Sequence, residues 1–277
     1  MNFEATLDQL GVLPADRRDL IEARPDPDLV QESAVRILVT FGQRDSAPAL
    51  PQGTDSYFAA HVCLALLPHI RSYHRSRDIP DDVSWATLRV LADNLARHRR
   101  IYGVGGLDGS RWVVRVYRGL AYRLGRLVFE CAHVGPPLAA VRPDLGPLDD
   151  ALGVHVPSSG PLIPAECDEA FSRAVRFFGE HFPEQVLGPA HCHSWLLDPQ
   201  LADYLPAQSN IVRFASRFRL LPNDDENDRA IVRWVFESAD PANLDALTAK
   251  TSLERAVLGH LRAGGQWRER RGWLELY

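Results

Sequence analysis

Lysine and paired cysteines are scarce in this chain of 277 residues. Lys250 is the one lysine among 31 basic residues, so an anion bound here meets guanidinium groups, which suit phosphate oxygens. The four cysteines, Cys63, Cys131, Cys167 and Cys192, form no C-x-x-C pair. This spacing argues against a disulfide scaffold and favours a reducing compartment.

Long apolar runs and a basic leader are also lacking. The longest apolar run, near residues 61–70, is far shorter than the ~20 residues of a membrane span. The first residues carry acids instead of a basic stretch, so no secretory signal is predicted. The net charge of −5 argues against nucleic acid as the main partner. We therefore expect a cytoplasmic protein that binds neither a membrane nor nucleic acid.

The composition is that of a packed globular protein, with 45% hydrophobic and 24% charged residues. A chain of this length predicts two domains or one large one. Residues 28–41, 55–75 and 82–100 predict long helices because they lack internal glycine. Pro68 is expected to kink or split the second of them.

The pattern changes after Gly103. Residues 111–118 and 122–131 predict two strands of a β-hairpin joined at Gly119. A proline-rich connector follows, and we place the domain boundary near residue 135. This divides the chain into residues 1–135 and 136–277.

The second half alternates between strand and helix patterns, and residues 167–182 form its clearest amphipathic helix. Thr251 and Glu254 predict a capping box for a late helix. The expected strands are 153–157, 190–197, 211–220, 230–237 and 267–277, and a short helix is expected over 199–205. The order predicts an α+β fold: a helical N-terminal domain that ends in a β-hairpin, followed by a layered α/β sandwich.

Five segments carry a family resemblance: residues 124–130, 155–162, 167–183, 192–199 and 205–211. Together they resemble the actinobacterial acyltransferase domain-containing proteins. Those proteins join an N-acyltransferase N-terminal domain to a GNAT-like C-terminal domain. The resemblance covers nearly the whole chain and is strongest over residues 124–220.

The resemblance implies a helical N-acyltransferase-like domain over residues 1–135. It implies a GNAT-like sandwich with a mostly antiparallel sheet over residues 136–277. The implied activity moves an acyl group from a CoA-type thioester to an amine, with acyl-CoA or acetyl-CoA as co-substrate and no metal. The implied acceptor is a small-molecule amine, and an acyl carrier protein is an alternative source of the thioester.

A glycine-rich loop is one candidate phosphate site. Arg100, Gly103 and Gly105 match the letters of the R-x-x-G-x-G loop of GNAT enzymes. That loop follows a strand and opens a helix, whereas this one follows a predicted helix and precedes a predicted strand. A helix C-cap and turn is the alternative interpretation.

A run of arginines surrounds this loop, with Asp108 as the one acid between residues 95 and 129. The run is a candidate for binding CoA phosphates or an acyl-carrier phosphopantetheine, with Arg115 and Arg126 beside Arg100 as ligands. A solvated face on an arginine-rich background is the alternative. The arginines are at positions 97, 99, 100, 111, 115, 118, 123 and 126.

Three residues near predicted strand ends are candidate general bases: His155, Glu130 and His193. Structural roles are the alternative for each. Cys192 is a candidate nucleophile, but adjacent residues of a strand point to opposite faces, so another histidine would have to activate it. The same alternation makes a metal site from His191, Cys192 and His193 unfavourable. The default for Cys192 is a buried thiol.

Polar residues in the resembling segments complete the candidates. Ser194, Ser209 and Asn210 could donate hydrogen bonds to a co-substrate, or could serve the backbone locally. Asp198, which precedes Pro199, predicts a helix N-cap.

Two functions from different classes are consistent with these residues. The first is a GNAT-like N-acyltransferase. The second is a ligand-binding or regulatory module that kept the fold without the chemistry. A cysteine-dependent hydrolase acting through Cys192 is a third and weaker hypothesis.

Overall fold

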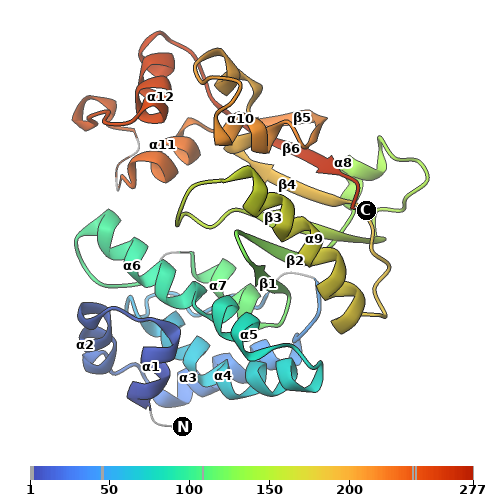
Figure 1. The fold of residues 1–277 in the computed structure, drawn as a ribbon. Coiled ribbons are helices and arrows are strands. Elements are labelled where there is room, and N and C mark those ends of the chain that lie inside the picture. Colours follow the sequence, from blue (N-terminus) through green and yellow to red (C-terminus); the bar gives the residue numbers. More distant parts are fainter. Residues whose placement is uncertain (1–2, 45–46, 108, 239, 241, 277) are drawn as a thin grey trace. The chain divides into compact units, whose positions relative to one another are not determined.

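The structure is a computed structural model, and it describes residues 3–44, 47–107, 109–238, 240 and 242–276. The chain divides into two compact units, Met1–Arg123 and Leu124–Tyr277, whose elements are labelled in Figure 1. This division falls ahead of the proline-rich connector at which we expected the domain boundary. Asp108, the one acid in the arginine run, lies outside the described residues.

The first unit is helical, as expected. Its elements are α1 (Phe3–Leu10), α2 (Pro14–Glu22), α3 (Pro27–Val39), α4 (Phe58–Ser76), α5 (Asp81–Leu88), α6 (Val90–Tyr102), α7 (Ser110–Tyr117) and the start of β1 (Ala121–Leu124). Capping residues set the ends of these helices. The Asp26 side chain accepts hydrogen bonds from the first backbone N–H groups of α3, and left-handed Gly103 ends α6.

Helix α4 runs through Pro68 without being split, and a kink at Pro68 stays a prediction. One expected helix was wrong in its bounds. The long helix expected over residues 82–100 is two helices, which meet at Arg89. The Arg89 guanidinium donates to the backbone carbonyl of Gln9, 3.2 Å away, so the junction is tied to the C-terminal end of α1.

The strand expected over residues 111–118 is helix α7, which corrects the first half of the predicted hairpin. Val113, Val114 and Tyr117 are buried, and a spacing of three and four residues places them on one helical face. A short apolar run of this kind is ambiguous between strand and helix, and packing against α4 and α6 decides it. The hairpin itself exists, but it consists of β1 and β2 (Leu127–His133), with Gly125 in the turn.

A buried polar cluster lies inside the first unit around His74. The His74 Nδ1 atom is 2.5 Å from the hydroxyl of Ser84, and the Arg71 guanidinium also donates to that hydroxyl. Arg71 in turn pairs with Asp81 at 2.7 Å. Burial, with a smaller effect of the Arg71 charge, lowers the pKa of His74 to about 3, so the folded chain holds a neutral imidazole.

The burial of His74 predicts a pH-dependent stability. Its pKa is about 3 in the folded chain against an ordinary value of 6.5, so the unfolded chain binds the proton first as the pH falls. This contribution is therefore complete above pH 6.5 and decreases as the pH falls toward 3. Urea unfolding at pH 7 and pH 4.5 should show a smaller difference for a His74→Gln variant. An equal difference would contradict the prediction.

The second unit is built on a six-stranded sheet in the order β1-β2-β3-β4-β6-β5. Strands β2 and β3, β4 and β6, and β5 and β6 pair antiparallel, whereas β3 and β4 are parallel. The predicted mostly antiparallel sheet is therefore confirmed. The remaining strands are β3 (Asp150–His155), β4 (Ala190–Ser194), β5 (Arg219–Glu226) and β6 (Arg268–Leu274).

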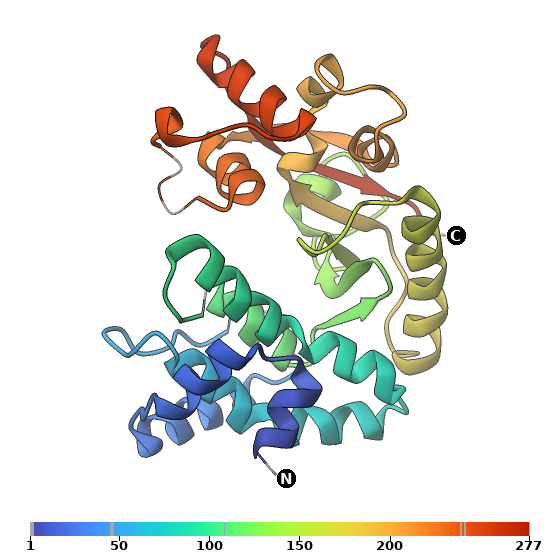
Figure 2. The same cartoon turned by 60° about the vertical axis from the view of Figure 1, so that its left-hand side comes forward.

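Helices flank this sheet, and the expected one over residues 167–182 is confirmed as α9. The helices are α8 (Gly135–Ala139), α9 (Pro164–His181), α10 (Asn210–Ala215), α11 (Asp228–Phe236) and α12 (Ser252–Arg262), with short 3₁₀ turns over Trp195–Leu197, Pro199–Asp203 and Leu244–Ala246. Figures 1 and 2 show α9 lying along the sheet. The rings of Phe129 in β2 and Phe171 in α9 pack edge to face, 5.5 Å apart.

Two expected strands were wrong, because their alternating patterns belong to helices. Residues 211–215 belong to α10, and Phe214 in this helix and Phe218 just after it are both buried. Residues 230–237 are largely α11, whose first turn is capped by the Asn227 side chain. The segment 222–228, expected to be a turn, mostly continues strand β5. The capping box of Thr251 and Glu254 is confirmed at the start of α12.

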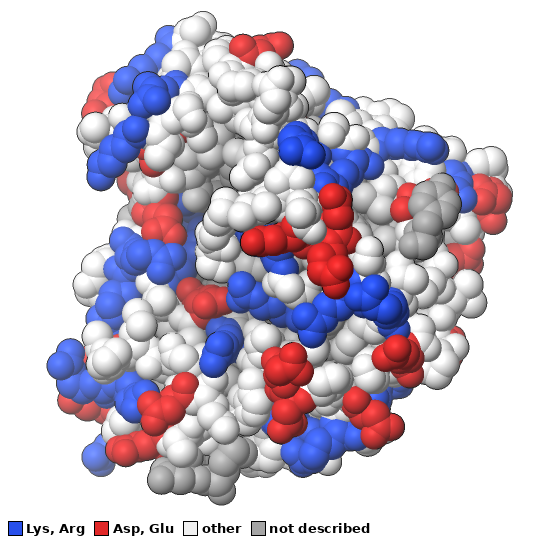
Figure 3. Space-filling view, viewed as in Figure 1, with Lys and Arg blue, Asp and Glu red and all other residues white. Residues whose placement is uncertain are grey.

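The surface carries both signs of charge close together. On the face shown in Figure 3, arginine side chains lie interspersed with acidic ones. Within the described part of the chain, no helix combines the length and apolarity that crossing a membrane requires.

Candidate functional site

A short polar contact in the second unit joins β2 to β3. The Nε2 atom of His155 lies 2.6 Å from Oε2 of Glu130. The Glu130 side chain is 9% exposed, whereas that of His155 is 40% exposed. A buried carboxylate therefore orients an imidazole whose other face reaches the surface. A histidine held in this way can accept a proton from a bound amine.

His191 in β4 completes a cluster with this pair. The register places Glu130 opposite Gly153, and Gly153 opposite His191, so the three lie in one row across three strands. Side chains paired directly across a sheet point to the same face. Glu130 and His155 both act electrostatically on His191. His155 lies two residues after Gly153 on β3 and so shares this face, which brings one carboxylate and two imidazoles together.

The His191 imidazole is held neutral in a defined orientation. Burial lowers the pKa of His191, and its ring forms a hydrogen bond with the backbone of His133. Its Nε2 atom is buried and has no hydrogen-bonding partner among the described residues. This arrangement leaves the Nε2 atom able to form a hydrogen bond with a bound group.

Gly153 leaves the space in which these side chains meet. A Cβ atom at this position would lie 3.3 Å from Oε2 of Glu130 and 3.5 Å from Nε2 of His155. The first distance is tighter than most Cβ contacts, so a larger residue would push the carboxylate aside. Glycine at this strand position thus serves the close approach of the side chains.

Strands β3 and β4 part beside the cluster. They pair at only two positions, Leu152 with Ala190 and Gly153 with His191. Beyond these positions, Val154 and His155 pair with β2, whereas Cys192 to Ser194 pair with β6. The backbone N–H and C=O groups that face between the two strands are therefore released from their ladder. His155 and His193 follow this point on the two strands.

The loop from β3 to α9 has the strand–loop–helix order of a phosphate site. It contains Ser158, Ser159 and left-handed Gly160, and no side chain caps the N-terminus of α9. The guanidinium of Arg126 holds this loop in place. It donates hydrogen bonds of 2.8–3.2 Å to the carbonyls of residues 157, 160 and 161. Arg126 thus contacts backbone carbonyls where we expected it to bind a CoA phosphate.

The remaining expected base, His193, and the expected nucleophile, Cys192, lie on β4. His193 is exposed and pairs in register with Arg271 of β6. Cys192 is 3% exposed and lies on the face opposite to His191. Burial raises the pKa of the Cys192 thiol to about 12, which argues against a nucleophilic role. Within the described residues, no cluster of histidine, cysteine and acidic side chains is placed to hold a metal ion.

Ser194 and Ser209 serve as local caps. The Ser194 hydroxyl accepts from the N–H of Leu196 at 3.1 Å, and the Ser209 hydroxyl accepts from Val212 at 3.3 Å. Asn210 is the first residue of α10. Asp198 is confirmed as an N-cap, because its carboxylate accepts from the N–H of Gln200 at 3.0 Å.

The expected phosphate loop lies in the first unit. Gly103 is the left-handed C-cap of α6, and a Cβ at Gly105 would clash with the Tyr57 hydroxyl. Arg100 lies in the last turn of α6, and Arg115 donates to the carbonyl of Arg44 at 3.1 Å. The loop therefore has the geometry of a helix end, which was the alternative interpretation.

Sequence reasoning missed His191 and Gly153. His191 was considered only as a metal ligand, although its strand position places it on the same face as His193. The serine-glycine loop at residues 158–160 was part of a resembling segment, but was not considered as a candidate phosphate site. Its signal is a pair of serines and a glycine between a strand and a helix.

Comparisons with known families cover both units. Residues 1–119 match the family described as N-acyltransferase N-terminal domain. Residues 121–274 match the family described as GNAT-like C-terminal domain. No curated protein matches this chain.

Solved structures of acyltransferases are similar to this chain over nearly its whole length. One is an acyltransferase in complex with decanoyl-CoA and teicoplanin, 36% identical, with a TM-score of 0.89. The match covers 99% of this chain and 87% of that chain. A mutant acyltransferase in complex with octanoyl-CoA and an acyltransferase in complex with CoA and 10C-teicoplanin match with the same identity, coverage and TM-score.

Proposed function

The chain belongs to the family that joins an N-acyltransferase N-terminal domain to a GNAT-like C-terminal domain, and from this membership we propose how it transfers an acyl group from CoA to an amine. The proposed base is His155, oriented by Glu130. The observation that carries the proposal is their 2.6 Å contact beside the point where β3 and β4 part.

The proposed reaction is direct transfer. His155 takes a proton from the ammonium form of the acceptor. The neutral amine that results then attacks the thioester carbonyl. The Glu130 carboxylate stabilises the imidazolium that forms, because it is buried against it. Backbone N–H groups at the point where β3 and β4 part polarise the carbonyl oxygen. The CoA thiolate then leaves and takes up the proton that the attacking nitrogen loses, so no covalent enzyme intermediate is needed.

His191 has a supporting role in this proposal. Its Nε2 atom can accept a hydrogen bond from the amine or from a water that passes the proton to His155. The serine-glycine loop and the N-terminus of α9 supply backbone N–H groups to the pyrophosphate of CoA. Arg126 keeps that loop in place and leaves the phosphates to the backbone.

The relatives suggest the class of substrates. Because they hold decanoyl-CoA and octanoyl-CoA, we propose a medium-chain acyl-CoA as the donor. A small-molecule amine of the kind that teicoplanin represents for those relatives is the proposed acceptor. An acyl carrier protein as the thioester source, and the cytoplasmic location, stay predictions.

Turnover with a defined donor tests the proposal. We expect the chain to release CoA from decanoyl-CoA only when an amine acceptor such as teicoplanin is present, measured by a thiol reagent and by the mass of the acylated product. Acetyl-CoA should be the poorer donor. An acyl group trapped on Cys192 would contradict direct transfer. Binding of acyl-CoA without turnover by any amine would favour the ligand-binding module.

A further inference from the structure

The arginine run in the first unit leaves one guanidinium available. Arg99 pairs with Asp16 and Asp19, Arg118 donates to backbone carbonyls, and Arg123 pairs with Asp93. Arg111, on α7, makes no hydrogen bond or ion pair with any residue that the structure describes. An exposed arginine at this position can therefore bind an anion without giving up a protein partner.

Arg111 lines a pocket that lies wholly within the first unit. The pocket has a volume of about 680 Å³, within the ~300–1,000 Å³ that small-molecule sites occupy. One wall is the segment 47–59, and the other is the N-terminal half of α7 together with Leu107. The N–H of Leu107 donates to the carbonyl of Ser56 at 3.0 Å, which ties the two walls together.

The α7 wall is suited to an anion. It presents the guanidinium of Arg111, the hydroxyl of Ser110 and a helix N-terminus that no side chain caps. Arg115 adds a second positive charge, although its Nη2 already donates to Arg44. Among the described residues that line the pocket, Asp55 is the one acid, and it accepts a hydrogen bond from the backbone of Tyr57 at 2.7 Å.

The opposite wall is apolar. Pro48, Leu50 and Pro51 come from the segment that covers the pocket, and Phe58 from the start of α4. Val114, one turn along α7 from Ser110, extends the apolar surface below the guanidinium. A ligand with a charged end and an apolar body would satisfy both walls at once.

We propose that this pocket binds an organic carboxylate with an apolar body, its carboxylate on Arg111 and its apolar part against the proline-rich segment. The pocket belongs to the first unit and the Glu130–His155 cluster to the second, and the proposal does not depend on acyl transfer. A carboxylate accepts two parallel hydrogen bonds from a guanidinium, which gives the contact its geometry.

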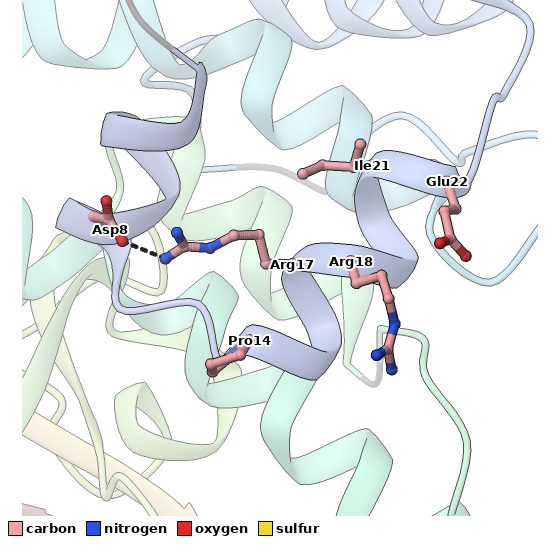
Figure 4. A pocket seen from close by; sticks show the side chains of 6 residues that line it. All are labelled: Asp8, Pro14, Arg17, Arg18, Ile21 and Glu22. Carbon is pink, nitrogen blue, oxygen red and sulfur yellow. Dashed lines mark hydrogen bonds and ion pairs between the residues drawn. The ribbon is translucent and has the colours of Figure 1, made fainter.

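A second hollow in the same unit differs from this pocket in the pairing of its guanidinium groups (Figure 4). It has a volume of about 540 Å³ between α1 and α2, and its residues are Asp8, Pro14, Arg17, Arg18, Ile21 and Glu22. Arg17 pairs across it with Asp8, and Arg18 lies 3.6 Å from Asp19. Its guanidinium groups are thus already paired, which distinguishes it from the pocket at Arg111.

Titration calorimetry on the full chain with sodium decanoate tests the proposal. We expect saturable binding, and about a tenfold weaker affinity for an Arg111→Ala variant, which corresponds to one charged contact of about 1.4 kcal/mol. The matched control is Arg36→Ala, which removes an exposed arginine of α3 that does not line the pocket and should leave the affinity unchanged. Decanamide, the neutral analogue, should bind more weakly and be insensitive to Arg111→Ala.

One further variant tests whether decanoate occupies this pocket. An Ala59→Phe variant fills the pocket from α4 and should abolish decanoate binding. If that variant does not fold, the Arg111 and Arg36 variants still decide the outcome. Decanoate affinity that is unchanged by Arg111→Ala, or binding of inorganic phosphate in place of decanoate, would overturn the proposal.

Discussion

Replacing His155 with glutamine is expected to lower kcat for acyl transfer about 100- to 10,000-fold, the range that a general base contributes. Glutamine can keep a hydrogen bond to Glu130, which lies 2.6 Å from the native imidazole, but it cannot accept a proton from the amine. The measurement is CoA released from decanoyl-CoA with an amine acceptor.

Three companion variants make this prediction specific. Glu130→Gln should cause a smaller loss than His155→Gln, because the imidazole stays but loses the carboxylate that orients it. His69→Gln removes an exposed histidine of the first unit and should be as active as the native chain. If His191→Gln caused the largest loss, the base would be His191, whose Nε2 has no partner among the described residues. A fully active His155→Gln variant would contradict the proposal.

Replacing Arg126 with alanine is expected to lower the free energy of unfolding by about 3 kcal/mol. Its guanidinium is 9% exposed and donates to three backbone carbonyls of the loop before α9, which would lose their donor. The loop would then no longer be held in place, and KM for acyl-CoA should rise at least about tenfold. Urea unfolding and steady-state kinetics measure the two effects.

Arg176 provides the control for Arg126. It pairs with Glu169 at 3.1 Å on α9, but both side chains are more than half exposed. Arg176→Ala should therefore change the free energy of unfolding by less than about 1 kcal/mol and leave KM unchanged. Arg126→Lys is expected to resemble Arg126→Ala, because a single ammonium cannot reproduce the planar fork. An unchanged KM in Arg126→Ala would show that the loop does not bind the donor.

The segments whose local patterns were strong were predicted well. Helix α9 has a full amphipathic pattern, and the capping box of α12 is formed by residues only three apart. The segments 111–118, 211–220 and 230–237 were wrong for one shared reason. Each is a short apolar run in which alternate positions and helical positions overlap, so packing partners decide between strand and helix.

The candidate site, too, was predicted only where local patterns were sufficient. His155 and Glu130 were identified from strand ends, but their contact was not, because they are separated along the chain and meet only through the register of β2 with β3. The arginine run was identified as cationic from composition. Its pairing with acids and carbonyls depends on neighbours from α2, α3 and α6, which no local pattern contains.

By itself, the sequence determined the fold class, the helical character of the first unit, the family resemblance and the chemical types available at the site. Only the tertiary structure decided that β3 and β4 part after Gly153, that Glu130, His155 and His191 gather there, and that Arg111 has no partner among the described residues beside its pocket. The physical reason is how far apart along the chain the interacting residues lie. Periodicity and capping act between residues a few positions apart, whereas strand register and side-chain pairing join residues that only the folded chain brings together.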